Sequence, residues 1–151
     1  MTLLNLGLSE IPSEILNLKN LTYLNLNSNS ITELPKTFSN LKSLGTLFLN
    51  NNQFTKVPDS IIELPKLHNL CMKNNKISEI PVALTDVWNA RIEDPSYRGS
   101  IYIPCNLIFS GNSIEHNSLS KEQELIVKGT GTHCQRNRNI RPIRPFDTES
   151  I

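Results

Sequence analysis

Apolar and polar positions along this chain repeat at a constant period, which separates Leu21 from Leu44 and Leu44 from Leu67. Three consecutive segments, 21–43, 44–66 and 67–89, share one order: leucine-type residues spaced as L-x-x-L-x-L, then an asparagine, two further apolar residues and a proline. The positions of each segment are numbered below as places, with its opening leucine in the first place. Self-similarity at such a period indicates the stacked coils of a solenoid, in which each coil covers the core of its neighbours.

The L-x-L part of each coil alternates with the period of a β-strand. Leu24 and Leu26 therefore point to one side, and Tyr23 and Asn25 to the other. Because one coil cannot bury its own apolar side, neighbouring strands are expected to form a parallel sheet over a shared core. The proline in the fifteenth place fixes φ and removes a donor. The return leg of each coil is therefore predicted to be extended or a short 3₁₀ turn rather than a long helix.

An asparagine occupies the ninth place, where the chain turns after the strand. Its side chain has both an acceptor and donors, so it can satisfy backbone groups that the turn leaves unpaired inside the stack. We predict a structural ladder formed by Asn29, Asn52, Asn75 and Asn112.

This pattern, L-x-x-L-x-L-x-x-N-x-φ-x-x-φ-P with φ apolar, resembles the leucine-rich repeat family. It is most similar to the class with proline in the fifteenth place, found in Ras-group intracellular and many bacterial leucine-rich repeat proteins. The similarity extends over roughly Leu4 to Ile114. It implies an α/β solenoid with a concave parallel sheet and a convex side of irregular or 3₁₀ turns. It also implies a non-enzymatic protein–protein interaction module with a scaffold, adaptor, signalling or recognition role.

The first coil, 1–20, is predicted to be shortened. Leu4 and Leu6 align with Leu24 and Leu26 if three residues are missing from the turn around Gly7.

At the other end, the frame breaks at Ala90. An insertion at 90–103 precedes a last coil at 104–117, a capping helix is predicted over 118–130, and 131–151 is expected to be an extended or disordered basic tail. Together, residues 1–117 form the predicted solenoid.

Side chains between the strand leucines are predicted to line the concave face. Tyr23, Phe48, Cys71 and Ile108 form an apolar track among amides there, and exposed aromatic or aliphatic residues of this kind are typical interface anchors. The predicted partner-binding residues are Tyr23, Asn25, Asn27, Thr46, Phe48, Asn50, Asn69, Cys71, Lys73 and Ile108.

The insertion brings aromatic residues close to the rim of the sheet. Trp88, Tyr97 and Tyr102 could form an additional arm of the binding surface. The alternative is a tolerated loop without a role, because long insertions add little loop entropy.

Composition excludes some classes of protein. The 151-residue chain has a formal net charge of +1, which indicates neither a nucleic-acid partner nor a membrane surface. Its apolar runs are far shorter than the roughly 20 residues of a membrane span, and no signal peptide is visible. Cys71, Cys105 and Cys134 lack the spacing of a disulfide framework. We therefore expect a cytoplasmic protein, or a fragment of a longer chain.

No catalytic arrangement is visible. The histidines are scattered, and neither a phosphate-binding loop nor a dinucleotide-binding glycine motif occurs. Cys105, His133 and Cys134 could be considered as zinc ligands, but the paired spacing that indicates such a site is missing. We predict no enzyme activity, cofactor, metal or small-molecule substrate.

Two alternatives stay open. The chain could be the recognition segment of a larger enzyme or effector, such as a ligase or kinase. Alternatively, the arginine-rich tail could tether the protein to nucleic acid or a membrane through phosphate contacts, although aromatic residues for stacking on bases are lacking until Phe146. A protein partner is favoured over both.

Overall fold

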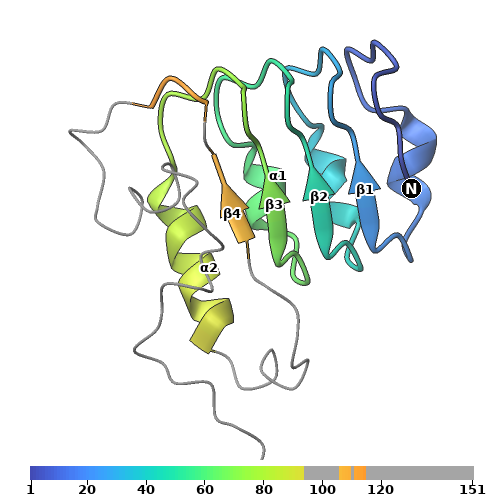
Figure 1. The fold of residues 1–151 in the computed structure, drawn as a ribbon. Coiled ribbons are helices and arrows are strands. Elements are labelled where there is room, and N and C mark those ends of the chain that lie inside the picture. The colour runs from blue at the N-terminus through green and yellow to red at the C-terminus, as the bar shows by residue number, and fades with distance from the viewer. Residues whose placement is uncertain (94–105, 110, 115–151) are drawn as a thin grey trace, which may run out of the picture.

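The computed structural model of the chain describes residues 1–93, 106–109 and 111–114. Strands and return-leg helices alternate along it (Figure 1). The elements are η1 (Ser13–Asn17), β1 (Tyr23–Asn25), η2 (Lys36–Asn40), β2 (Thr46–Phe48), α1 (Asp59–Ile62), β3 (Asn69–Cys71), α2 (Val82–Glu93) and β4 (Asn106–Ile108). From β1 to β3, and from η1 to α2, equivalent elements begin one sequence period apart, as the repeat predicts.

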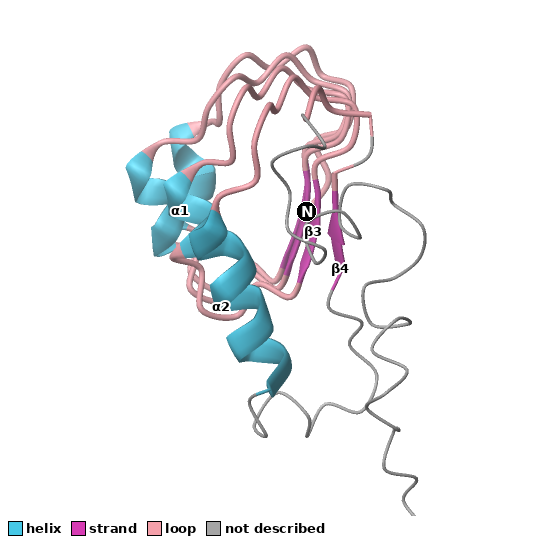
Figure 2. Ribbon diagram, turned by 90° about the vertical axis from the view of Figure 1, so that its left-hand side faces the viewer, coloured by secondary structure: helices cyan, strands magenta, loops and turns pink. Residues whose placement is uncertain are grey.

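The four strands form one parallel sheet in the order β1-β2-β3-β4. Its register follows the repeat, because Leu24 pairs with Leu47, Leu47 with Leu70, and Leu70 with Leu107. Strands and helices form two layers, with the strands on one side of the coils and the helices on the other (Figure 2). The predicted α/β solenoid with a parallel sheet is confirmed.

The core lies between these layers and is continuous from coil to coil. Leucines of the fourth and sixth places face it from the sheet, and apolar residues of the eighteenth place face it from the return legs. The largest fully buried side chains are Phe38, Phe54, Phe109, Leu24, Leu26, Ile31, Leu41, Leu44, Leu47, Leu49 and Ile61.

The first coil departs from the prediction. Thr2, and not Asn5, pairs with Asn25, and the Asn5 N–H donates to the Asn27 carbonyl over 3.0 Å. The coil therefore keeps the full period of the repeat, and its turn lacks no residues. Leu4 and Leu6 fall in the seventh and ninth places and are 49% and 59% exposed.

The reason is backbone pairing, which a search for leucines does not detect. In the correct register Leu3 and Leu8 take the core places, and both pack against the core. Because side chains alternate between faces, aligning Leu4 instead of Leu3 with the strand leucines reverses the face assigned to each residue.

The return legs begin after a proline in each complete coil. Pro12, Pro35 and Pro58 have φ of −54°, −66° and −65°, and each precedes a short helical turn. These turns have the predicted length: η1 and η2 are 3₁₀ turns of five residues, and α1 is an α-helix of four.

The helix α2 is an exception, with 12 residues. It runs across residue 90, where the insertion was predicted to begin, up to Glu93. The next strand starts at Asn106 rather than one period after Asn69, so the chain need not turn back at once. No proline or glycine interrupts Val82–Glu93, and its alanine, leucine, arginine and glutamate residues favour a helix.

The remaining expectations for this end of the chain concern residues outside the described ranges. These are the rest of the insertion, the capping helix at 118–130 and the basic tail at 131–151.

A residue in the left-handed conformation occupies the eighth place of each described coil. Asn5, Ser28, Asn51 and Asn74 have φ of 56°, 57°, 55° and 53°, and Gly111 has φ of 76° in the last coil. Asparagine and glycine tolerate this conformation better than most residues do. The sharp turn that it produces directs the ninth-place asparagine back into the stack.

Candidate interaction face

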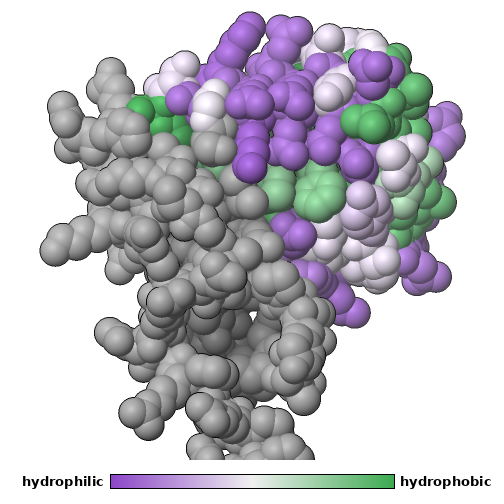
Figure 3. Space-filling view, in the orientation of Figure 1, coloured by the Kyte–Doolittle hydropathy of each residue, from purple (hydrophilic) through white to green (hydrophobic). Residues whose placement is uncertain are grey.

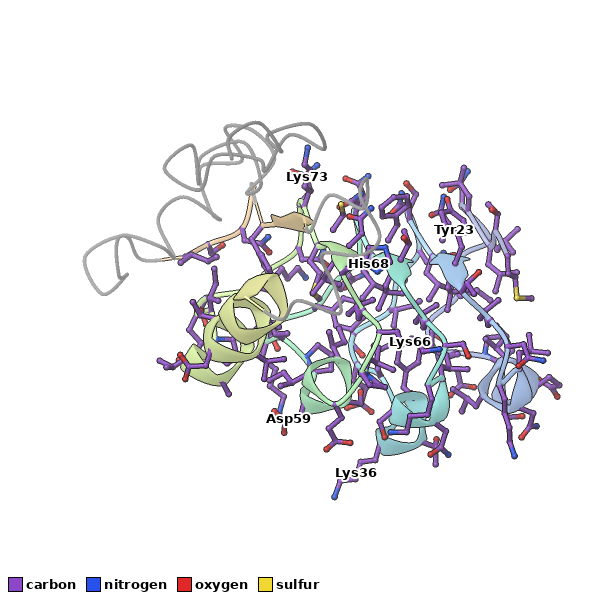
Figure 4. The ribbon with its side chains drawn as sticks, turned by 90° about the horizontal axis from the view of Figure 1, so that it is seen from below. Tyr23, Lys36, Asp59, Lys66, His68 and Lys73 are labelled. Carbon is purple, nitrogen blue, oxygen red and sulfur yellow. The ribbon has the colours of Figure 1, made fainter. Side chains whose placement is uncertain are left out.

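The concave face is the side of the sheet opposite the helices. It is defined here by the third and fifth places, which lie in the strands, and by the seventh place, which follows each strand. These places hold Tyr23, Asn25, Asn27, Thr46, Phe48, Asn50, Asn69, Cys71 and Lys73. Tyr23 and Lys73 lie on this side of the molecule, and Lys36 and Asp59 lie on the helical side (Figure 4). Ile108 belongs to β4, which pairs with β3 through Cys71.

An aromatic pair lies on β1 and β2. The rings of Tyr23 and Phe48 meet edge to face, with centroids 5.6 Å apart and an angle of 87° between their planes. Tyr23 is 36% exposed and Phe48 is half-buried. Such a pair presents rigid apolar surface at little cost in conformational entropy. In the space-filling view, the described residues on this side are largely hydrophilic, and a small apolar patch lies among them (Figure 3).

Cys71 differs from its predicted place in the exposed track. It is only 8% exposed, since it lies in the middle of the sheet between Phe48 of β2 and the paired strand β4. Burial raises the pKa of the Cys71 thiol, and the positive charge of Lys73 acts in the opposite direction. The sulfur lies 3.9 Å from Asn69 Oδ1, to which the thiol donates. A buried, protonated thiol is a packing residue and a poor nucleophile.

The ninth-place asparagines link each coil to the one before it. Their Oδ1 atoms accept the N–H of the eleventh place of the preceding coil: Leu8 to Asn29 at 3.0 Å, Ile31 to Asn52 at 3.1 Å, Phe54 to Asn75 at 3.1 Å, and Ile77 to Asn112 at 3.0 Å. Asn29, Asn52 and Asn75 are themselves buried.

Their Nδ2 groups donate to carbonyls of the sixth place. Asn52, for example, donates to Leu26 of the preceding coil at 3.0 Å and to Leu49 of its own coil at 3.2 Å. Asn75 and Asn112 repeat this arrangement with the next coils. These bonds satisfy buried backbone groups that have no strand partner, and so stabilise the stack rather than form a recognition site.

A second ladder runs along the concave face itself. Asn27 Oδ1 accepts the Asn50 N–H at 2.7 Å, and Asn50 Oδ1 accepts the Lys73 N–H at 2.8 Å. Sequence reasoning assigned Asn27 and Asn50 only to the binding surface and missed this structural role. The sequence does indicate this ladder, because asparagine occupies the seventh place in two successive coils and is followed by lysine in the third.

The predicted arm is only partly described. Trp88 belongs to α2, and Tyr97 and Tyr102 lie outside the described ranges.

The described residues contain no group of three or more histidine, cysteine, aspartate or glutamate side chains that could hold a metal ion. Cys105, His133 and Cys134 are outside those residues. His68, which directly precedes β3, places its Nδ1 3.0 Å from the Lys66 carbonyl, so its ring is engaged by its own loop. None of the helices in the described part of the chain is long and apolar enough to cross a membrane.

The chain is similar to several solved structures. An internalin from Listeria monocytogenes matches with a TM-score of 0.52 and 22% identity, over 72% of this chain and 27% of its own. The BIR2 ectodomain from Arabidopsis thaliana matches with a TM-score of 0.48 and 27% identity, over 74% and 53%. A leucine-rich repeat protein of Leptospira interrogans matches with a TM-score of 0.36 and 20% identity, over 82% and 39%.

The chain thus spans about a quarter to a half of the length of these proteins. No curated protein matches it. The sequence profile of the family described as "Leucine-rich repeat region" matches residues 2–87, which is more than half of the chain. Because the strand, the turn and the proline leg recur in this matched segment, the chain belongs to the leucine-rich repeat family.

Proposed function

We propose that this protein binds a protein partner on its concave face and acts as a non-enzymatic recognition, adaptor or scaffold module. The leucine-rich repeat fold is in general that of a protein-interaction module. The observation that supports this particular face is the Tyr23–Phe48 pair, which lies on a sheet surface that the helices leave open. Aromatic residues surrounded by polar groups are typical anchors of protein interfaces.

The dimensions of the face suit a peptide segment. Four strands at a spacing of about 4.8 Å give a surface on the order of 15–20 Å wide.

A cytoplasmic location is part of the proposal and rests on the spacing of the cysteines alone.

The proposal is tested with Phe48→Asp in a pull-down from lysate beside the wild type. We expect the partner to be lost, because a charge replaces the apolar anchor while the core residue Leu47 of β2 stays in place. Thr37→Asp is the matched control, since it adds the same charge at an exposed position of η2 on the helical side. Circular dichroism of each variant checks that it is folded.

A partner that Phe48→Asp retains would contradict the proposal. If deletion after Gly131 abolished that binding instead, the arginine-rich tail would be the binding segment, as one alternative holds. The other alternative, a recognition segment of a larger enzyme, predicts the same loss with Phe48→Asp and differs only in what the partner is recruited to.

A further inference from the structure

We propose that the segment bound by the concave face is an extended acidic peptide. This inference rests on the proposed function and adds the chemistry of the partner. It follows from three features of the face: the orientation of its amides, the distribution of its charges and the position of its aromatic pair.

The orientation of three amides is dictated by the backbone. The N–H groups of Asn27, Asn50 and Lys73 face the side chains of Asn25, Asn27 and Asn50 at 3.0, 2.7 and 2.8 Å. A backbone N–H can only donate, so the atom that faces it must be the amide oxygen. Each of these three amide oxygens therefore already accepts one hydrogen bond inside the protein.

The Nδ2 groups are left for a partner. Within the described residues, those of Asn25, Asn27 and Asn50 have no hydrogen-bond acceptor, and each carries two N–H donors. Asn69 also uses its amide oxygen within the protein, since its Oδ1 accepts from the Cys71 thiol. The face consequently offers donors in excess, and a partner that lacked acceptors would leave them desolvated and unpaired.

Acidic side chains are absent from the described part of this face. In the coils that make up residues 1–89, the first twelve places contain no aspartate or glutamate, and the acids begin only at the thirteenth place, with Glu10, Glu33 and Glu79. Asp59 lies on the opposite side of the molecule from Lys73, which projects at the concave face (Figure 4). Among the described residues, Lys73 is therefore a cation with no competing carboxylate beside it on the face.

The aromatic pair sets the spacing of the ligand. Phe48 pairs with Cys71 at the end of β3, and Lys73 follows two residues later. From Phe48 to Lys73 is therefore one strand spacing plus two extended residues, roughly 8 Å. An extended peptide covers this distance in about two to three residues. A matching segment therefore has an apolar side chain on the Tyr23–Phe48 pair and a carboxylate two or three residues away.

Nucleic acid fits the face less well than a peptide. Its affinity grows with the number of phosphates that lysine and arginine neutralise, and the described part of the concave face has Lys73 as its only lysine or arginine. The apolar pair also has no role in contacting phosphates. A single strand of DNA is nevertheless included in the test.

The test uses two fluorescein-labelled peptide pools and the full-length chain. One pool alternates glutamate with a mixture of leucine, tyrosine and threonine, and the other has glutamine in place of glutamate. Fluorescence anisotropy should show about fivefold to tenfold tighter binding of the glutamate pool, because hydrogen bonds to a charged acceptor are stronger than those to a neutral one. The preference should shrink between about 50 mM and about 300 mM salt.

Variants at Lys73 test whether this residue causes the preference for the glutamate pool. Lys73→Gln should remove most of the preference for glutamate, and Lys73→Glu should reverse it. Lys36→Glu is the control, since Lys36 is exposed on the helical side and should leave binding unchanged.

Equal binding of the two pools, no binding of the glutamate pool, or tighter binding of oligo-dT would each overturn the acidic-peptide inference. If the pools bound equally and Phe48→Asp abolished both interactions, the concave face would still be the binding site. Peptide binding that Phe48→Asp left intact would contradict the proposed function itself.

Discussion

At the scale of single residues, asparagine has two structural roles in this protein. In the ninth place its side chain is buried and replaces missing strand partners, and in the seventh place it joins neighbouring coils at the surface. The ninth-place role makes a direct prediction. Asn52→Ala leaves the buried Ile31 N–H without an acceptor, so the free energy of unfolding in urea should fall by about 1–3 kcal/mol.

The matched control is its exposed neighbour. Gln53→Ala loses only a 3.5 Å contact with Lys76 and should change the free energy of unfolding by less than about 0.5 kcal/mol. Similar values for both variants would mean that the ladder does not stabilise the stack.

Alanine substitutions at two glycines with positive φ distinguish the cost of backbone strain from the cost of steric overlap. Gly7 has φ of 67° and no atom within 4 Å of the place that a Cβ would take, whereas a Cβ on Gly111 would overlap Asn74 Oδ1. Gly7→Ala should destabilise the protein by about 1–2 kcal/mol, the cost of a left-handed residue. Gly111→Ala should lower stability by at least about 1 kcal/mol more. Thermal or urea denaturation measures both, and equal losses would show that Asn74 moves aside freely.

The buried thiol predicts a pH dependence of stability. Burial raises the pKa of Cys71 in the folded state, so the folded protein holds this proton more tightly than the unfolded chain does. The bound proton contributes fully to the stability of the folded state below the ordinary pKa of a thiol. This contribution is lost as the pH rises from that pKa toward the raised pKa of Cys71 in the folded protein. Urea unfolding at neutral and alkaline pH should therefore show a steeper loss of stability for the wild type than for Cys71→Ala. Parallel curves would argue against a shifted thiol.

At the scale of elements, the register of the first coil is the clearest test of how the strands pair. Leu3 packs against the core and its neighbour Leu4 is exposed. Leu4→Asp should change the free energy of unfolding by less than about 0.5 kcal/mol. Leu3→Asp should lower it by about 2 kcal/mol or more, because it brings a charge to apolar surroundings. The reverse order would restore the register in which Leu4 faces the core.

The elements also show where sequence patterns reach their limit. Each return leg in the described part of the chain begins where the proline column predicts, yet among these four only α2 is a 12-residue helix. The difference arises from the longer path to the next strand. Helix length therefore depends on the spacing of elements as well as on local propensity.

At the scale of the whole molecule, the solenoid is a sum of coils and interfaces between neighbours. A second copy of residues 44–66 inserted after residue 66 should therefore fold and raise the free energy of unfolding, because each new residue meets its own equivalent in both neighbours. Insertion of 45–66 alone should destabilise the protein, since one missing residue shifts the strand register. Circular dichroism and urea denaturation distinguish the two, and equal stability would contradict the nearest-neighbour picture.

The period of the repeat was enough to determine the fold class, the core leucines and the places of the ladder asparagines. These features recur in every complete coil, so each copy supports the same assignment. Burial and orientation do not repeat in this way. Cys71 is buried because of what flanks it in the sheet, and the first coil takes its register from backbone bonds to β1.

The same division applies to the candidate interaction face. The alternation of the strands was sufficient to assign Tyr23, Phe48 and the asparagines to one side of the sheet. Only the tertiary structure decided which amide atoms are engaged within the protein and which are left for a partner, because a side-chain amide orients toward the backbone N–H of the neighbouring coil. Sequence order thus determined which residues lie on the face, and contacts between coils determined the chemistry that they present.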